Sequence, residues 1–266
     1  MNTTIIIVSY KSELLIDKNI KRLSAKHKII IIDNARDKIL KRNLEKKFKN
    51  VRVILNKNNG FGQAANLGAK KSKTKYVLFC SPDNFLEKKA IAKLEGFSKK
   101  LNDNFGLLIL MEKEKLKRKV YEIKKPNSFL TFFTQRKVFL RLKGFDENFF
   151  LYYEDNDFMK RILLDNLKIY EVPVSFKAFK GSHNPKFNYE IELNRNWHFM
   201  WSKFYYFNKH YGYLFSLFVT IPYFIRSLFR IILNFKNHKT RKIYLHRLLG
   251  LMNSYILNKS WFRPKI

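Results

Sequence analysis

The sequence is poor in cysteine and in acidic residues. Its one cysteine, Cys80, excludes an internal disulfide and a cysteine-rich zinc site, as expected of a protein kept in a reducing compartment. Only 21 Asp and Glu stand against 54 Lys and Arg, which gives a net charge of +33. No Asp or Glu follows Glu192, whereas 13 Lys or Arg lie between Arg195 and Lys265. This excess favours an anionic partner, although a compositional bias toward Lys, Asn, Ile and Phe explains part of it.

A secretory signal and a long apolar segment are also missing. The apolar run Thr4 to Val8 is too short for a signal peptide and ends in a polar loop. The run Tyr213 to Ile225 contains Pro222, is followed by Arg226 and Arg230, and is shorter than the roughly 20 residues that span a bilayer. We expect it to lie on a membrane surface; a spanning segment and packing against the core are the alternatives. The predicted location is cytoplasmic, at the inner face of the cell membrane.

The composition is that of a folded chain, with 46% hydrophobic and 16% aromatic residues. Over the first 110 residues, short apolar runs alternate with amphipathic stretches, which predicts βαβ units around a buried parallel sheet. The predicted strands of this region are Thr4–Ser9, Lys28–Asp33, Val51–Asn56 and Tyr76–Ser81. The predicted helices between them are Glu13–Leu23, Lys38–Phe48 and Gln63–Lys73.

The pattern is less regular in the second half of the chain. Further strands are predicted at Gly106–Leu110, Val120–Ile123 and Leu167–Val172, and helices at Gln135–Lys143 and from Asp155 onward. From Glu190 the chain is basic, aromatic and helical in pattern. We therefore predict an α/β domain over residues 1–189 and a helical, basic extension over residues 190–266.

Polar residues occur where the predicted parallel strands end. They are Ser9, Asp33, Asn56 and Ser81. The carboxyl ends of the strands are where ligands bind in open α/β sheets. Asp33 can accept hydrogen bonds from a base or ribose there, or it can cap a turn. The loop 58–62 enters a helix, and its glycines let backbone amides approach a phosphate.

Two acidic sites stand out in so basic a chain. Asp83 lies in a turn stiffened by Pro82, where it suits a hard divalent cation that keeps phosphate oxygens as further ligands, or is an ordinary turn residue. Glu154, Asp155 and Asp157 cluster in an aromatic stretch, where apolar surroundings raise the pKa of a carboxylate toward that of a general base. Asp157 as a helix cap and Glu154 in an ion pair are the alternatives.

Histidines give a weaker signal. His183 follows Ser182 in a loop after the last predicted strand, where it is either a ligand of a metal or phosphate, or solvated. His198 and His210 lie among aromatic residues at helical spacing, which indicates packing. No His-Glu-x-x-His, nucleophile elbow or paired-cysteine motif occurs, which argues against a hydrolase and against a zinc-binding protein.

Five short motifs follow one another in order between residues 4 and 161. They are Ile5–Tyr10, Ile32–Asn34, Asn59–Gly62 with Asn66 and Gly68, Ser81–Asp83, and Gly144–Glu147 leading to Tyr153–Asp157. Together they resemble the family 2 glycosyltransferases, and the nearest branch is that of the rhamnosyltransferase-type enzymes. The resemblance implies the GT-A fold, a Rossmann-like α/β domain. It also implies inverting transfer of a sugar, rhamnose or another hexose, from a nucleotide-diphosphate donor, with Mg or Mn as cofactor.

The resemblance further implies roles for single residues. The implied donor site comprises Ser9, Tyr10 and Asp33 around the nucleoside, and Asn59, Gly60 and Asn66 near the ribose and phosphates. Asp83 would hold the metal against the diphosphate, and His183 would be a further ligand, because Phe179 occupies the position nearest to the family's metal-binding histidine. Asp155 would be the base, with Glu154 beside it.

The sequence thus predicts a glycosyltransferase of cell-surface polysaccharide synthesis. Its acceptor would be a glycan or a lipid-linked sugar. It would work at an anionic membrane surface, as a monomer or as an oligomer. A basic nucleic-acid-binding protein is the alternative from another class, and it would bind with an affinity that falls steeply with salt. We expect no specific nucleic acid. A non-catalytic subunit of a polysaccharide assembly complex is the third hypothesis.

Overall fold

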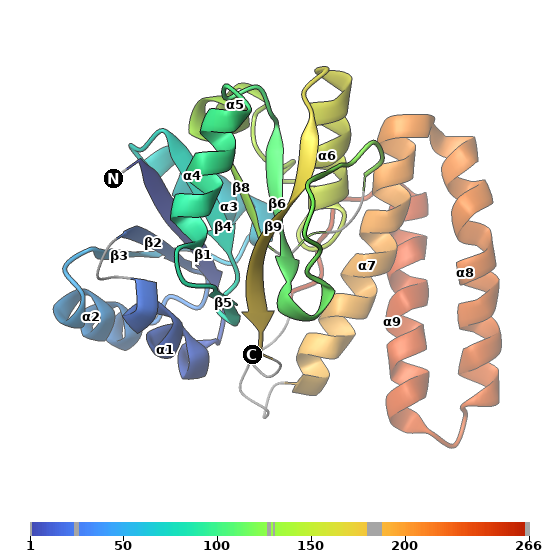
Figure 1. The fold of residues 1–266 in the computed structure, drawn as a ribbon. Helices are drawn as coiled ribbons and strands as arrows, with labels where there is room; N and C mark the ends of the chain where they lie inside the picture. The colour runs from blue at the N-terminus through green and yellow to red at the C-terminus, as the bar shows by residue number, and fades with distance from the viewer. Residues whose placement is uncertain (1, 24–26, 127–128, 130, 180–187, 264–266) are drawn as a thin grey trace. The chain divides into compact units, whose positions relative to one another are not determined.

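The computed structural model of the protein describes residues 2–23, 27–126, 129, 131–179 and 188–263 (Figure 1). The chain divides into two compact units. We call the first the sheet unit, Met1–Asp146 with Asp155–Asn184, and the second the helical unit, Glu147–Glu154 with Pro185–Ile266. The domain boundary predicted at residue 189 stays a prediction. The segment 147–154, which the sequence does not mark as separate, groups with the C-terminal helices.

The first half of the sheet unit is the parallel part of one sheet. Its strands lie in the order β3-β2-β1-β4, and each pairing is parallel. They are β1 (Thr3–Ser9), β2 (Lys28–Asp33), β3 (Val51–Leu55) and β4 (Tyr76–Cys80). The connecting helices are α1 (Glu13–Leu23), α2 (Lys38–Lys47) and α3 (Phe61–Lys71). These elements confirm the predicted βαβ pattern, with boundaries within two residues of those predicted.

The core lies on both faces of this sheet. Ile5 and Ile7 belong to one buried cluster and Ile6 to another, because successive side chains of a strand point to opposite faces. Strands covered on both faces need apolar residues at every position, which is why β1 and β2 read as unbroken isoleucine runs rather than as alternating patterns. The only polar groups these strands contribute lie near their ends.

The second half of the sheet mixes strand directions. β8 (Phe132–Gln135) lies between β4 and β6 (Leu107–Glu112) and is antiparallel to both. β9 (Ile169–Ala178) runs parallel to β6, with a register shift at Pro173, which has no N–H to donate to the ladder. The remaining elements of this half are β5 (Asn84–Leu86), α4 (Ala90–Lys100), β7 (Tyr121–Glu122), α5 (Arg136–Arg141) and α6 (Glu154–Leu164).

The helical unit contains three long helices that run side by side (Figure 1). They are α7 (Asn188–Tyr211), α8 (Tyr213–Leu233) and α9 (His238–Tyr255). The segment 147–154 packs on α7: the Phe150 ring stacks on His198 with 4.3 Å between ring centres, and Ser202 Oγ donates a 2.9 Å hydrogen bond to Leu151 O. The helical pattern predicted for the tail is confirmed.

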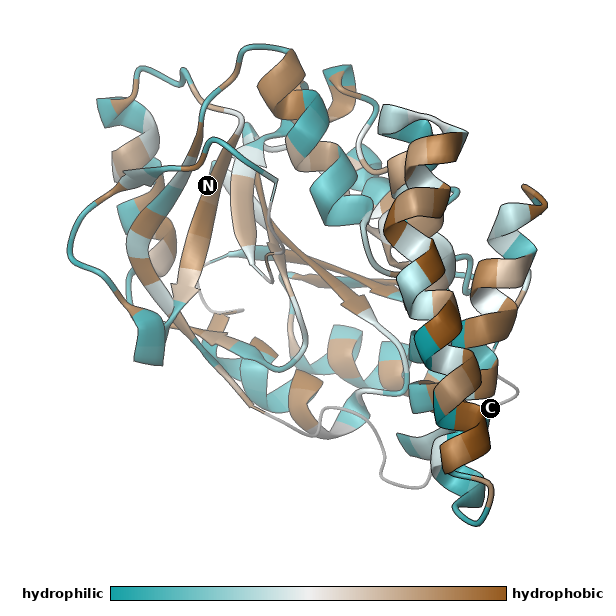
Figure 2. Cartoon of the chain, turned by 90° about the vertical axis from the view of Figure 1, so that its right-hand side faces the viewer, coloured by the Kyte–Doolittle hydropathy of each residue, from teal (hydrophilic) through white to brown (hydrophobic). Residues whose placement is uncertain are grey.

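Helix α8 buries polar residues and exposes apolar ones, the reverse of the arrangement in a water-soluble protein. The buried residues are small and polar, namely Ser216, Thr220 and Ser227, and each hydroxyl donates to the carbonyl four residues earlier. Leu214 and Phe218, by contrast, are 81% and 77% exposed. By length and composition α8 is able to cross a membrane. Figure 2 shows hydrophobic residues, in brown, along the helices of this unit.

Candidate active site

The carboxyl ends of β1 and β2 lie side by side and present two buried polar groups. Ser9 and Asp33 are paired in the strand register, and both side chains are buried. Ser9 Oγ has no hydrogen-bond partner within the described part of the chain. A buried hydroxyl without a partner costs free energy, so this position suits a polar ligand group.

The Asp33 carboxylate organises the turn after β2. Its two oxygens accept hydrogen bonds from the backbone N–H of Ala35 at 3.2 Å and of Asp37 at 2.7 Å. Burial raises the pKa of Asp33, although these two N–H groups oppose the shift. Asp33 therefore caps a turn. Each oxygen can still accept a further hydrogen bond, and the contact with a nucleoside stays a prediction.

An asparagine network joins this turn to the loop before α3. Asn34 Nδ2 donates to Asn58 Oδ1 at 3.3 Å and to Gly60 O at 3.4 Å, and Asn56 Nδ2 donates to Asn34 Oδ1 at 2.8 Å. The Asn58 side chain is also a hydrogen-bond partner of Tyr10, whose pKa is raised by burial. The loops that follow β1, β2 and β3 thus form one polar surface, with the exposed Asn59 at its rim.

The turn that carries Asp83 is fixed from two sides. Asn19 Nδ2 of α1 donates to Pro82 O and to Asn84 O, both at 3.1 Å. Asn84 Nδ2 in turn donates to Thr131 Oγ1 at 2.9 Å. The Asp83 side chain is partly exposed, and its backbone O accepts from Phe179 N at 3.0 Å. The segment after β9 therefore begins next to Asp83.

Asp155 is connected to the same edge of the sheet. Its carboxylate accepts from Phe129 N at 3.3 Å, and Phe129 precedes Thr131 by two residues. Thr131 precedes Phe132, which pairs with Phe79 at the carboxyl end of β4. Asp155 and Asn84, the neighbour of Asp83, thus both hydrogen-bond to the short chain segment that leads into β8, and the Asp155 side chain is partly exposed.

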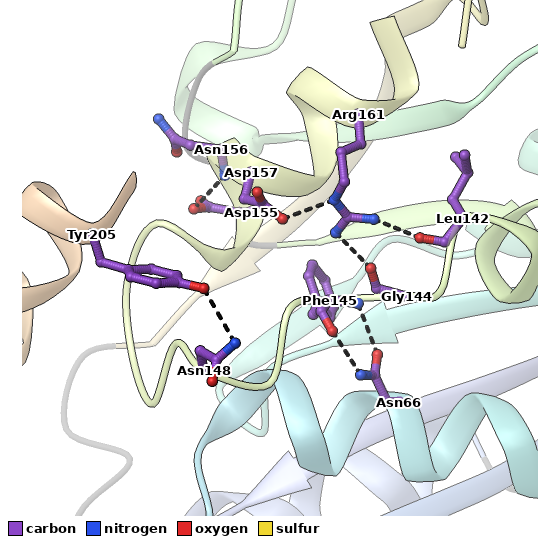
Figure 3. A network of polar contacts seen from close by, with 10 residues as sticks. All are labelled: Asn66, Leu142, Gly144, Phe145, Asn148, Asp155, Asn156, Asp157, Arg161 and Tyr205. Atoms are coloured by element: carbon purple, nitrogen blue, oxygen red, sulfur yellow. Dashed lines mark hydrogen bonds and ion pairs between the residues drawn. The ribbon is translucent and has the colours of Figure 1, made fainter. Parts of the chain in front are cut away.

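Asp157 has a structural environment instead. It is fully buried and accepts from Arg161 Nε at 2.8 Å, while the same guanidinium donates to Leu142 O and Gly144 O (Figure 3). Gly144 has a φ of +61°, a conformation that favours glycine. The ion pair therefore fixes the turn that precedes the Phe145 segment.

Asn66 is held against that turn from the other side. Its side chain accepts from Phe145 N and donates to Phe145 O, both at 2.8 Å (Figure 3). These two bonds occupy one oxygen and one nitrogen of a buried amide. The predicted contact of Asn66 with the donor remains a prediction, whereas its structural contact is clear.

Glu154 and His183 are the last two of the predicted site residues. Glu154 is buried at the start of α6, and the division between the two units falls between Glu154 and Asp155. His183, the predicted metal ligand, lies outside the described residues.

The residues suit a metal only when phosphate oxygens complete its ligands. Within the described residues no group of three His, Cys, Asp or Glu is arranged to hold an ion. A magnesium-type ion is commonly held by one or two carboxylates together with water and substrate phosphates, and Asp83 can supply such a carboxylate. Cys80, close by, is not a nucleophile, because burial raises its pKa to about 12 and the charge of Asp83 adds to this effect.

The sequence alone missed two of the residues that hold the site together. Asn34, Asn58 and Asn84 lie in or next to the motifs described above, but no local pattern marks Asn19 or Thr131, which fix the turn of Asp83. Their partners lie up to 65 residues away in the sequence. The polar residues at the ends of the strands indicated only that a site lies at this edge of the sheet.

A profile of the glycosyl transferase family 2 matches residues 4–161. A search of curated proteins found no match. Among solved structures, TarS 1-349 of S. aureus in complex with UDP is 16% identical, with a TM-score of 0.57 over 99% of this chain and 93% of that one. The longer S. aureus TarS structure is 17% identical, with a TM-score of 0.55 over 80% of this chain. The matched part is only 44% of the TarS chain.

Another similar structure is the mannosyltransferase PcManGT from Pyrobaculum calidifontis in complex with GDP-Man and Mn2+. It is 10% identical to this chain, with a TM-score of 0.57 over 95% of this chain and 86% of that one. At such low identity these likenesses show the fold, which agrees with the α/β architecture described above. The profile covers the sheet unit from the start of β1 to the middle of α6.

Proposed function

Because the chain belongs to glycosyl transferase family 2 and has the GT-A fold, we propose that it transfers a sugar from a nucleotide-diphosphate donor to an acceptor hydroxyl. One observation carries the assignment of the site. Asp155 and the residue next to Asp83 both hydrogen-bond to one segment: Phe129 N donates to Asp155, and Asn84 donates to Thr131. A carboxylate for the donor and a carboxylate for the acceptor thus share one edge of the sheet.

The nucleoside of the donor binds over the ends of β1 and β2. Ser9 Oγ and the Asp33 carboxylate are the polar groups for the base and ribose, with Tyr10 beside them. The unpartnered Ser9 hydroxyl supports this role. Asn59 and Gly60 supply the loop near the ribose and phosphates, where glycine allows the close approach of backbone amides. UDP bound to the TarS structure and GDP-Man bound to PcManGT are consistent with a nucleotide donor.

A divalent metal would be held by Asp83 and by His183. When bound, Mg or Mn neutralises charge that develops on the leaving diphosphate. The hydrogen bond from Phe179 N to Asp83 O supports this pairing, because Phe179 precedes His183 by only four residues in the sequence. The Mn2+ in the PcManGT structure is consistent with it.

Asp155 is the general base. It takes the proton of the acceptor hydroxyl while that oxygen bonds to the anomeric carbon, and the bond from this carbon to the diphosphate oxygen breaks on the opposite face. The electron pair leaves with the nucleotide diphosphate, and the anomeric centre is inverted in one displacement. Glu154 lies next to Asp155 in sequence and adds negative charge near the attacking hydroxyl. The partial exposure of Asp155 supports access to an acceptor.

The acceptor is a glycan or lipid-linked sugar handled at the cytoplasmic face of a membrane, and the transferred sugar is rhamnose or another hexose. The support comes from α8, which packs through Ser216, Thr220 and Ser227 and turns its large apolar residues outward. Small residues at helix contacts with apolar residues facing away are typical of helices in lipid. With Arg226 and Arg230 on one flank, α8 fits a helix lying in the membrane interface.

A single substitution tests the base. Asp155→Asn keeps the shape of the side chain and removes the proton acceptor. We expect the rate of sugar transfer to fall about 10²- to 10⁴-fold, while the affinity for the nucleotide sugar stays within about twofold. The rate is measured with a panel of nucleotide sugars and Mn, and the affinity by calorimetry. Asp165→Asn, just after the end of α6 in a surface ion pair with Arg141, is the matched control. Full transfer activity in Asp155→Asn would exclude this residue as the base.

The metal site is tested by binding rather than by turnover. We expect Asp83→Asn to weaken the binding of a nucleoside diphosphate in the presence of Mn by about tenfold or more, and to leave binding without Mn within about twofold. His183→Ala should have the same selective effect, whereas His238→Ala, at the exposed start of α9, should have none. Metal-independent binding in all of these proteins would contradict the assignment.

A further inference from the structure

Three cationic side chains of the helical unit lie near Tyr223 of α8, two of them at least half-buried and the third exposed. Lys203 of α7 is only 7% exposed, and its Nζ lies 3.6 Å from the centre of the Tyr223 ring on α8. Arg247 of α9 is half-buried with its guanidinium over the Tyr244 ring, and its Nε is buried with no hydrogen-bond partner in the described part of the chain. Arg226 is the third cation; it is exposed and follows Tyr223 on α8 by three residues, so the two side chains lie on the same side of the helix.

The electrostatics show that these charges act on one another. The pKa of the Tyr223 hydroxyl is lowered, chiefly by Lys203 and further by Arg247 and Arg226. Burial lowers the pKa of Arg247, and the charge of Arg226 acts in the same direction. Like charges that are partly removed from water raise the free energy of the folded state unless a counter-ion joins them.

The part of the chain that the structure describes supplies no such counter-ion. In the described residues none of the three cations takes part in an ion pair with a carboxylate. The sequence explains why, because no Asp or Glu occurs after Glu192 and the helices α8 and α9 therefore carry only positive charge. The cluster is thus suited to an anion from outside the protein.

We propose that Lys203, Arg226 and Arg247 form a binding site for the phosphate group of a membrane lipid. Guanidinium groups donate paired hydrogen bonds that match phosphate oxygens, and the ammonium adds a compact charge. The Tyr223 hydroxyl adds a donor of its own. The site rests on the proposed association of α8 with a membrane, and it gives that association a specific ligand.

The position of Arg226 favours a lipid over a soluble phosphate. Arg226 follows Ile225, which is 59% exposed in the outward apolar face of α8. Successive residues of a helix are about 100° apart, so Arg226 lies on the flank of that face. A phosphate held there has apolar surface beside it for acyl chains, as at the boundary between headgroups and acyl chains of a bilayer.

The test uses the full chain and a short-chain phosphatidic acid below its critical micelle concentration. A monomeric lipid has no membrane surface potential, so only a specific site responds to it. We expect saturable binding by calorimetry, weakened about tenfold or more in Arg226→Gln and in Arg247→Gln. Arg241→Gln removes the same charge from the exposed start of α9 and should change the affinity less than twofold. Because Arg226 is exposed, its replacement leaves the packing of the helices unchanged.

Three results would overturn the proposal. They are equal affinity of Arg226→Gln and wild type, an equal loss in Arg241→Gln, and binding of inorganic phosphate as tight as that of the lipid. The last would indicate a site for soluble phosphates. If the protein still binds vesicles when one of these results is found, the membrane association stands and only the lipid-phosphate site is wrong. The two proposals can therefore fail separately. Loss of sugar transfer in Asp155→Asn bears on neither.

Discussion

Two carboxylates two positions apart on α6 have opposite surroundings. Asp155 is partly exposed and accepts from the backbone of Phe129, whereas Asp157 is buried against Arg161. Residues i and i+2 of a helix point about 200° apart, so one faces the edge of the sheet and the other the core. The acidic cluster in the sequence could not separate a candidate base from a structural ion pair, because that distinction depends on what packs against each face.

The structural member of this pair should affect stability far more than a surface pair. We expect Asp157→Asn to lower the free energy of unfolding by about 3 kcal/mol, because Arg161 loses its counter-ion in a largely buried position. Urea unfolding followed by circular dichroism measures the loss. In the control Asp165→Asn, which breaks the exposed pair with Arg141, the loss should stay below about 1 kcal/mol. Equal small losses would show that the Asp157 pair does not hold the turn.

His198 makes the stability of the helical unit depend on pH. It is buried, its Nε2 lies 2.9 Å from Phe262 O, and burial lowers its pKa to about 3. The unfolded chain takes up a proton near pH 6.5, whereas the folded chain does so only near pH 3. Stability is therefore complete above pH 6.5 and should fall by about 1.4 kcal/mol per pH unit below it.

Tryptophan fluorescence measures this effect, since all three tryptophans, Trp197, Trp201 and Trp261, belong to the helical unit. Denaturant unfolding is compared between pH 6.5 and 5.5, where most carboxylates remain ionised. His198→Gln should remove the dependence. A flat profile in the wild type would mean that the imidazole accepts a proton without loss of packing.

At the scale of elements, prediction from sequence succeeded where hydrophobic periods are long. The helices and strands up to Cys80 were predicted within two residues. β5 has three residues and β8 four, too few to show a period, and β8 becomes a strand only because it fits between β4 and β6. Lys89, at the N-cap position before α4, has a φ of +62° and makes no side-chain cap hydrogen bond, so the helix lacks the usual start signal.

The close packing of α9 on α7 is another feature that periodicity does not reveal. A Cβ atom at Gly250 would lie 2.3 Å from Trp197 O, a backbone atom that moves only with its helix. We expect Gly250→Ala to lower the free energy of unfolding of the helical unit by about 1–3 kcal/mol, measured by tryptophan fluorescence in denaturant. Gly96→Ala in α4 meets nothing within 4 Å and should instead raise stability by about 0.5–1 kcal/mol in circular dichroism. A loss of the same size in both would point to a general intolerance of alanine.

At the scale of the whole molecule, the net charge of +33 admits either a membrane or a nucleic acid, and the exposed surface of α8 separates them. Nucleic-acid binding relies on contacts between basic groups and phosphates and gives no reason for a helix with large apolar residues turned outward. A membrane interface accounts for both the basic and the apolar surface. Family membership explains the motifs of residues 4–161 without any nucleic acid.

The membrane proposal is best tested by substitutions on the outward face of α8. Removal of residues 213–266 would also remove α9, which packs against α7, and would confuse unfolding with loss of membrane contact. Phe218→Gln and Ile225→Gln change only exposed side chains, and each should lower the partition into anionic vesicles about tenfold in a flotation assay.

Ile39→Gln is the matched control, because Ile39 is an exposed apolar residue on α2. Its partition should equal that of the wild type. If the α8 variants bind vesicles normally but sediment as a smaller species, the apolar face is covered by a second copy of the chain and the membrane proposal is wrong. A graded loss of vesicle binding with unchanged sedimentation and unchanged thermal unfolding would instead assign the outward face of α8 to lipid. The arginines on its flank would then face the headgroups of that lipid.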